Sequence, residues 1–217
     1  MPQLHHTLAD AARCLSRGGA LIFPTETFYA LGCLASDAAA VARIYHIKGR
    51  EAALPLPLLA ADREQAAWAA CLEAVPQGLF DRFWPGPLTV LLPARPSLPA
   101  ALVNSQGKTA VRVSSHRQAA ELARLAGGPL TASSANPHGR PAVHQFRNIE
   151  AALLRTLDEH SLDAGLFKGE PPTGGLPSTL VEPLETMSRN RPLLRLVRAG
   201  AVSTGALEAA GFCVRLA

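Results

Sequence analysis

The sequence has few cysteines, and they do not form the motifs that metal sites or disulfide-rich scaffolds use. The 217 residues include four, Cys14, Cys33, Cys71 and Cys213, with no CxxC pair and no neighbouring His/Cys cluster. The spacing of metal ligands is therefore absent, and a disulfide framework is not expected in a chain of this size. The sequence predicts no dedicated metal site.

A long apolar run and a signal peptide are also missing. The longest apolar run extends from Ala52 to Ala61, and because Pro55 and Pro57 interrupt it, it is too short to span a bilayer. The first residues, MPQLHHTLAD, lack the basic segment and following apolar segment that a signal peptide requires. We expect a cytoplasmic protein without membrane contacts.

Aromatic residues make up only 5% of the chain, which suggests no stacking platform of the kind that binds single-stranded nucleic acid. Apolar residues make up 48% and charged residues 18%, an ordinary globular composition that argues against disorder. The net charge of +4 favours anionic partners such as nucleotides or RNA only mildly, and many small enzymes are basic for no specific reason.

Helical and extended patterns alternate along the chain. Apolar stripes that begin after Thr7 and Asp37 predict two helices with capping residues. Further helices are predicted at 63–75, 117–126 and 148–157 and after Ser203. Short apolar runs predict strands at 20–23, 56–60, 88–92, 109–113, 130–132, 179–181 and 193–198. The interleaving predicts an α/β fold with a largely central sheet, in a single domain over residues 1–217 that no repeat or long linker divides.

The first predicted strand ends in a polar segment, Pro24-Thr25-Glu26-Thr27. Two hydroxyls and a carboxylate thus follow a strand terminus, where ligands usually bind in open α/β sheets. The alternative is a capping turn, because Thr and Glu also satisfy backbone groups in turns. The segment alone leaves both interpretations open.

A basic segment, His46-Ile47-Lys48-Gly49-Arg50, ends the second predicted helix. Cations at a helix C-terminus complement the helix dipole. Lys48 and Arg50 also suit a clamp for phosphates, with a point charge from lysine and a bidentate guanidinium from arginine. A KxR pair occurs by chance in many proteins, so both interpretations stay open here too.

Three further strand ends carry hydroxyls or a guanidinium. They are the segment SSANP with Ser134 and Asn136, the pair Ser178-Thr179, and Arg198. Small residues and hydroxyls after a strand allow close approach to a phosphate, although each segment is also a common polar turn. No Ser/His/Asp triad, Walker A loop or GxGxxG fingerprint is present. The pattern therefore suits an anionic substrate and gives no candidate for covalent catalysis.

Taken in order, seven short blocks resemble the signature of the YrdC-like family. They are PTETFYALG, KGR, WPGPLT, TAVRV, SSANP, PSTLV and RAG, and the similarity runs from about Gly18 to Gly200. Each block is modest, but seven in this order are specific. The family includes the threonylcarbamoyl-AMP synthases, often called TsaC, and the chain resembles the type without the extra C-terminal domain of the longer synthases.

The resemblance implies a twisted mixed sheet flanked by helices around a deep, positively charged cavity. It also implies a reaction in which the amine of L-threonine captures bicarbonate as a carbamate. The carbamate attacks the α-phosphate of ATP and expels pyrophosphate, which gives threonylcarbamoyl-AMP for tRNA modification. Such a transfer needs positioning and charge neutralisation rather than a protein nucleophile. Mg2+ is expected with ATP, held mainly by the phosphates.

The resemblance also implies which residues bind threonine. Thr27 looks like a threonine contact, and Arg112 resembles the arginine that grips the threonine carboxylate, a task that suits a bidentate guanidinium. Ser178 is expected to close the site from its C-terminal side. The implied partners beyond ATP, threonine and bicarbonate are tRNA or double-stranded RNA and the proteins that transfer the threonylcarbamoyl group.

Nucleotide binding is implied for five residues. Lys48 and Arg50 look like the catalytic pair that binds the ATP phosphates and steadies the transition state. Ser134 and Asn136 look like nucleotide contacts in the SSANP block, and Arg198 is expected to act with them.

The sequence departs from the usual family pattern at five positions. Ala30 replaces a glycine, Glu51 replaces a proline, and Ala199 replaces the proline of RPG. Leu54 stands where an asparagine commonly binds the nucleotide, and Leu59 falls near a position often occupied by histidine beside the threonine. A substrate group that loses a polar partner costs about 1–3 kcal/mol, so the two leucines bear on the substrate rather than on the fold.

Two other functions are compatible with these residues. An RNA-binding or ribosome-associated protein would use the basic cavity without chemistry, and the mild positive charge fits it. A divergent paralogue would act on another carbamoyl or acyl-adenylate substrate, as Leu54 and Leu59 suggest. The presence of KGR, SSAN and ST together favours the synthase.

Overall fold

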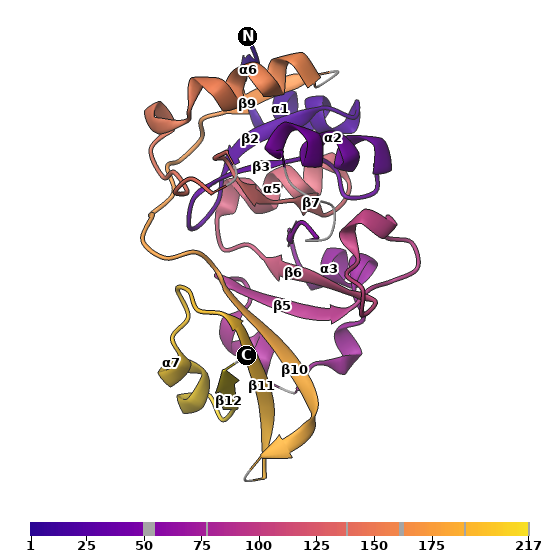
Figure 1. The fold of residues 1–217 in the computed structure, drawn as a ribbon, viewed down its shortest axis with the longest axis vertical. Helices are drawn as coiled ribbons and strands as arrows, with labels where there is room; N and C mark the ends of the chain where they lie inside the picture. The colour runs from indigo at the N-terminus through magenta and orange to yellow at the C-terminus, as the bar shows by residue number, and fades with distance from the viewer. Residues whose placement is uncertain (50–54, 77, 138, 161–162, 189, 217) are drawn as a thin grey trace.

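The computed structural model describes residues 1–49, 55–76, 78–137, 139–160, 163–188 and 190–216. Its helices and strands alternate along the chain, which confirms the predicted mixed α/β class. The strands pair in two sheets, where one largely central sheet was expected. The chain forms an elongated body, with the N-terminus at one end and a long hairpin at the other (Figure 1).

A five-stranded sheet lies toward the N-terminal end of the body (Figure 1), in the order β1-β9-β2-β3-β8. Its strands are β1 (Gln3–His5), β2 (Ala20–Pro24), β3 (Tyr29–Gly32), β8 (Ser133–Ser134) and β9 (Ala164–Phe167). β9 pairs in parallel with β1 and β2, whereas β3 is antiparallel to β2 and β8. The segment that follows β2 is therefore the turn of a β2–β3 hairpin.

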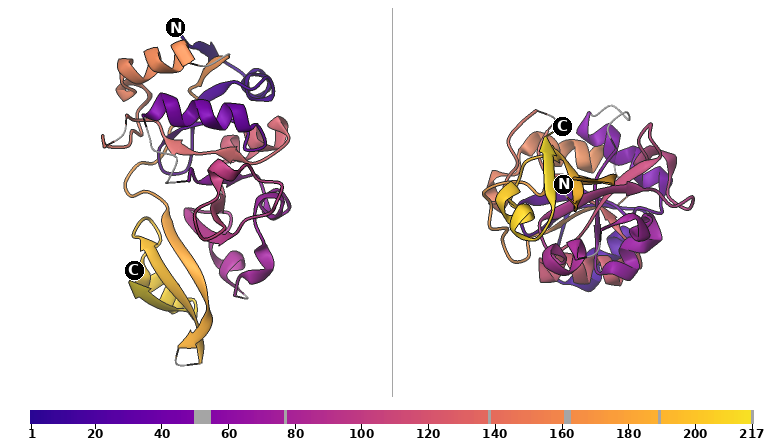
Figure 2. Two further views of the ribbon diagram at one scale, coloured as in Figure 1. Left: turned by 45° about the vertical axis from the view of Figure 1, so that its right-hand side comes forward. Right: turned by 90° about the horizontal axis from the view of Figure 1, so that it is seen from below.

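A seven-stranded mixed sheet has the order β12-β11-β10-β5-β6-β4-β7. Its strands are β4 (Leu58–Ala60), β5 (Leu88–Pro93), β6 (Lys108–Val113), β7 (Leu130–Thr131), β10 (Thr179–Ser188), β11 (Arg191–Arg198) and β12 (Cys213–Leu216). β10 pairs in parallel with β5 and antiparallel with β11. The β10–β11 hairpin extends away from the helices that surround the first sheet (Figure 2).

Helices flank both sheets, and α1 packs against α5 while α2 packs against α6. The α-helices are α1 (Leu8–Ser16), α2 (Ala38–Lys48), α3 (Arg63–Ala69), α4 (Leu79–Phe83), α5 (Arg117–Ala126), α6 (Ala151–His160) and α7 (Thr204–Ala209). The side chains of Thr7 and Asp37 accept backbone hydrogen bonds at helix starts, as the sequence predicts. Ser203 does the same at the start of α7. No helix in the described ranges is long and apolar enough to cross a membrane.

Strands β2 and β4 are buried on both faces and separate two apolar clusters. Leu21 and Phe23 belong to the cluster under α1 and α5, whereas Ile22 belongs to the larger one. On β4, Leu59 joins the first of these clusters and Leu58 the second. Alternate residues of a strand point to opposite faces, so each strand contributes to both clusters. Because β2 and β4 are buried on both faces, the positions of the segments that follow them are fixed as well.

The structure differs from the predicted elements in three ways. The helix predicted at 63–75 ends at Ala69, because Ala70 has extended backbone and forms a bridge with Ala94. The remainder is a short 3-10 helix, Leu72–Ala74. The strands predicted at 179–181 and 193–198 are parts of the longer β10–β11 hairpin. The sequence also did not predict β1, β3, β8, β9 and β12, and β8, with two residues, has no apolar run that reveals it.

All four cysteines are free thiols. Cys14 and Cys33 are buried, and burial raises the pKa of each thiol to about 12. A thiol reacts as its thiolate, so neither of these two side chains is a nucleophile near neutral pH.

Candidate functional site

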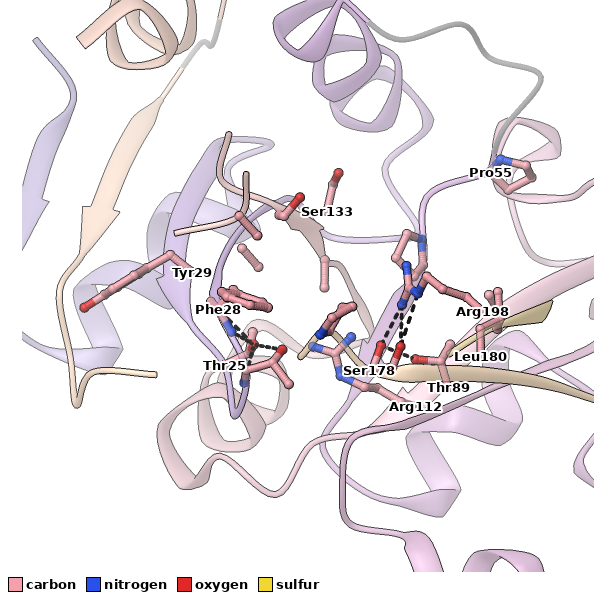
Figure 3. Close-up of a pocket in the computed structure, with 18 residues that line it drawn as sticks. Thr25, Phe28, Tyr29, Pro55, Thr89, Arg112, Ser133, Ser178, Leu180 and Arg198 are labelled. Carbon is pink, nitrogen blue, oxygen red and sulfur yellow. Dashed lines mark hydrogen bonds between the residues drawn. The ribbon is translucent and has the colours of Figure 1, made fainter. Parts of the chain in front are cut away.

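A cavity of about 240 Å3 lies where the two sheets meet (Figure 3). Residues of the β2–β3 hairpin and of β8 line it from one sheet, and residues of β5, β6, β10 and β11 line it from the other. The predicted site residues that line the cavity are Thr27, Arg112, Ser134, Ser178 and Arg198. The structure therefore brings together residues that lie far apart in the sequence.

Arg112 reaches the cavity from β6, and a buried carboxylate holds it there. Its Nε pairs with Oε1 of Glu26 at 2.7 Å, and the two side chains are 5% and 8% exposed. The other oxygen of Glu26 accepts a hydrogen bond of 2.5 Å from Ser114 Oγ. No described residue other than Glu26 pairs with the guanidinium. Its terminal nitrogens are therefore available to an anion in the cavity.

Ser178 lies directly before β10 and binds two neighbouring side chains. Arg198, at the end of β11, donates to the Ser178 carbonyl at 2.7 Å and to its Oγ at 3.0 Å. Thr89, on β5, donates to the same Oγ at 2.9 Å. Figure 3 shows these three side chains together beside Arg112. One wall of the cavity thus presents two guanidiniums and two hydroxyls.

The Pro24–Thr27 segment forms the facing wall. Thr25 Oγ1 donates to the carbonyl of Phe28 at 2.7 Å and so closes the hairpin turn. Thr27 lines the cavity, and its carbonyl accepts a hydrogen bond of 2.9 Å from Gly174 N. Thr25 thus forms the capping turn, whereas Thr27 lines the cavity and its contact with threonine stays a prediction.

Lys48 lies behind the cavity wall. It is 5% exposed, and its Nζ donates to the carbonyls of Ser134 at 2.5 Å and Asn136 at 2.6 Å. The Asn136 amide donates to the carbonyls of Pro137 and Arg140, whereas its buried Oδ1 has no hydrogen-bond partner. The ammonium thus supports the SSANP loop, and the catalytic role of Lys48 stays a prediction.

The residues that depart from the family pattern lie at different distances from the cavity. Leu59 is fully buried in the cluster under α1 and α5 and does not line the cavity. Leu59 is therefore not part of the described wall, and its effect on the substrate stays a prediction. Ala30 lines the cavity, where it pairs with Ser134 of β8. Arg50, Glu51 and Leu54 lie outside the described residues, so the predictions for them stay untested.

The chemical character of the lining suits an oxyanion. Among the described residues it contains two arginines and no carboxylate, and Glu26 is engaged by Arg112 and Ser114. In the same part of the chain, no three His, Cys, Asp or Glu side chains gather as metal ligands would. The predicted positive charge of the cavity depends on Arg198 and on how far Glu26 neutralises Arg112.

Two polar residues that contact the site, Thr89 and Ser114, were not predicted from the sequence. Thr89 lies within a predicted apolar strand, and a buried hydroxyl there needs a partner, which is the signal that identifies it. Ser114 directly follows a predicted strand, as the other site residues do. No pattern in the sequence pairs Glu26 with Arg112, because only the fold brings them together.

The chain is similar to known proteins over most of its length. The family model Sua5_yciO_yrdC, described as telomere recombination, matches residues 13–199. A threonylcarbamoyl-AMP synthase of Stenotrophomonas maltophilia is 38% identical over 173 residues, which are 78% of this chain and 89% of that protein. One of Chromohalobacter salexigens is 38% identical over 154 residues, which are 70% of this chain and 83% of that protein.

The fold matches a solved structure of P. abyssi Sua5 complexed with L-threonine. The TM-score is 0.78 and the sequences are 29% identical. The match covers 99% of this chain but 62% of the Sua5 chain. This chain therefore spans about three fifths of the length of that protein.

Gly200, in the RAG block, allows the end of β11 to approach the segment that carries Ser178. A Cβ at Gly200 would overlap the Pro177 carbonyl oxygen and lie 2.6 Å from the Ser178 carbonyl carbon. We expect Gly200→Ala to displace Ser178 and to lower the free energy of unfolding by about 1–3 kcal/mol, as overpacking does. Chemical denaturation of the purified variant measures this loss.

Gly205→Ala, in α7, is the matched control. The nearest atom to a Cβ there is Ser203 Oγ at 3.9 Å, and alanine favours a helix more than glycine does. This variant is expected to keep or raise the stability. A Gly200→Ala protein as stable as the wild type would contradict the close packing inferred for the RAG block.

Proposed function

Because the chain belongs to the Sua5/YciO/YrdC family, we propose that it is a threonylcarbamoyl-AMP synthase. It acts as a nucleotidyltransferase that forms threonylcarbamoyl-AMP and pyrophosphate from L-threonine, bicarbonate and ATP. The observation that carries this proposal is the cavity between the sheets, in which Arg112, Ser178 and Arg198 gather from separate strands.

Threonine binds in this proposal with its carboxylate on Arg112. Glu26 Oε1 forms an ion pair with Nε at 2.7 Å without hydrogen-bond geometry. No described residue pairs with the terminal nitrogens, which offer a fork that matches a carboxylate. Thr27 approaches from the facing wall. The cavity volume of about 240 Å3 lies below the range of about 300–1,000 Å3 that is usual for drug-sized ligands. It suits an amino acid, and we place ATP at its open side beside Ser134.

The chemistry needs no protein nucleophile. The threonine amine adds to bicarbonate with loss of water and gives a carbamate. A carbamate oxygen then attacks the α-phosphorus of ATP, and the bond to the bridging oxygen breaks to release pyrophosphate. The residues of this chain hold the two anions in line and neutralise their charge. Arg198 and Arg50 supply guanidiniums for this task.

Lys48 supports the nucleotide site in this proposal by holding the loop that carries Ser134 and Asn136. The unpaired Oδ1 of Asn136 is an acceptor that a nucleotide amino group would satisfy. Buried acceptors without partners are uncommon in proteins. Asn136 itself does not line the cavity, so the support for a nucleotide beside this loop comes from Ser134, which does.

Mg2+ belongs to the proposal as part of the ATP complex. The described lining offers hydroxyls and guanidiniums and no carboxylate, so a metal ion fits only where the phosphates themselves hold it. When bound, Mg2+ would neutralise phosphate charge. The product is an activated intermediate, and a transfer reaction on tRNA must consume it. We place both steps in the cytoplasm, with tRNA and the transfer proteins as partners.

The proposed activity is tested by pyrophosphate release from ATP in the presence of bicarbonate and Mg2+. Release is expected with L-threonine and not with serine, glycine or no amino acid. Folded protein that releases no pyrophosphate with any of them would contradict the proposal. Salt-dependent RNA binding without turnover would then favour the RNA-binding alternative.

Arg112→Lys tests the carboxylate contact while it keeps a positive charge beside Glu26. Lysine lacks the bidentate fork, so the KM for threonine is expected to rise at least tenfold, which corresponds to about 1.4 kcal/mol. The KM for ATP should change much less, and Arg117→Lys, at an exposed position in α5, should change neither. Equal increases of the two KM values in Arg112→Lys would rule out the assigned role.

A further inference from the structure

Thr89 is a buried hydroxyl that contacts another hydroxyl in the cavity wall. It is 1% exposed and lies on β5, where it pairs in register with Leu180 of β10. This register places it beside Ser178, the residue directly before β10. Thr89 Oγ1 donates to Ser178 Oγ at 2.9 Å, and Val90, the next residue on the strand, points into the core on the other face.

The oxygen of Ser178 receives two hydrogen bonds. One comes from Thr89 at 2.9 Å and the other from a terminal nitrogen of Arg198 at 3.0 Å. A hydroxyl has two acceptor lone pairs and one proton to donate. Both lone pairs are thus occupied, so the group can interact further only as a donor.

The hydroxyl proton of Ser178 can be donated only toward the cavity. No described residue accepts it, although Ser178 is only 5% exposed. The side chain lines the cavity beside Arg112. Because a buried donor without an acceptor is costly, the proton is directed at whatever occupies the cavity.

We propose that Thr89 is a positioning residue that fixes Ser178 as a hydrogen-bond donor to an oxyanion of the substrate. The inference rests on the proposed function for the identity of that oxyanion, a carboxylate of threonine or an oxygen of the pyrophosphate group. It extends that function, because Thr89 acts only through Ser178. A ligand group that itself donates is rejected at this point, since Ser178 has no free lone pair to accept from it.

A second buried threonine provides a comparison within the same sheet. Thr109, on the adjacent strand β6, is fully buried, and its Oγ1 has no hydrogen-bond partner. Replacing it by valine removes a hydroxyl of similar burial that has no hydrogen-bond partner. Thr109→Val is therefore the matched control for Thr89→Val.

The test is a double-mutant cycle with Thr89→Val and Ser178→Ala in the full chain, with Thr89→Ser and Thr109→Val as controls. Calorimetry measures the affinity of each protein for L-threonine and, separately, for inorganic pyrophosphate. Ser178→Ala is expected to lower the affinity for one of the two ligands. Thr89→Val should lower the affinity for the same ligand by about tenfold, as the loss of a charge-assisted hydrogen bond does. In the Ser178→Ala background it should have no further effect, because coupled residues are non-additive.

The two controls separate positioning from a structural role. Thr89→Ser keeps the hydroxyl and should restore the affinity, whereas Thr109→Val should leave it unchanged. Additive losses in the double variant, unchanged affinity in Thr89→Val, or unchanged affinity in Ser178→Ala would each overturn the proposal. Thr89→Ala gives the same comparison if the valine variant does not fold.

Failure of the proposed function would be visible independently. In that case the wild type releases no pyrophosphate with threonine, while the cycle still reports whether Thr89 acts through Ser178 on a bound anion. The threonine and pyrophosphate titrations also show which oxyanion accepts the hydrogen bond from Ser178.

Discussion

The buried ion pair between Glu26 and Arg112 is the contact on which the arrangement of the site depends. It joins the hairpin turn after β2 to strand β6, and so connects the two sheets across the cavity. Removing one partner of such a pair costs about 3–5 kcal/mol, because the other charge stays buried. Ser114 satisfies the second carboxylate oxygen. The pair therefore holds the guanidinium of Arg112 beside the hairpin turn, in the wall of the cavity.

The other polar groups of the site follow the same principle, in which each is held by a neighbour from a different element. Arg198 and Thr89 hold Ser178, and the ammonium of Lys48 holds the loop of Asn136. Groups fixed in this way need no reorganisation when charge develops, which is how enzymes stabilise anionic transition states. As a consequence, a single substitution also changes the positions of site residues that it does not contact.

The sequence predicted the parts of the structure that local forces determine. The capping side chains of Thr7 and Asp37 and the apolar strands are local features, and they form as expected. Family resemblance identified Arg112 and Ser178, which do line the cavity. The pairing of Glu26 with Arg112 could not be predicted, because it depends on how two sheets meet. The position of Lys48 outside the cavity lining likewise depends on its hydrogen bonds to backbone carbonyls, which no sequence motif reveals.

Glu26 holds the Arg112 guanidinium in the cavity wall, where we propose that its terminal nitrogens bind the carboxylate of threonine. The most direct test is a crystal structure of the protein with L-threonine. We expect the carboxylate oxygens to accept hydrogen bonds from the terminal nitrogens of Arg112, while Nε keeps its ion pair with Glu26. Threonine bound with its carboxylate elsewhere, and Arg112 in contact with Glu26 alone, would contradict the assignment of Arg112 to the carboxylate.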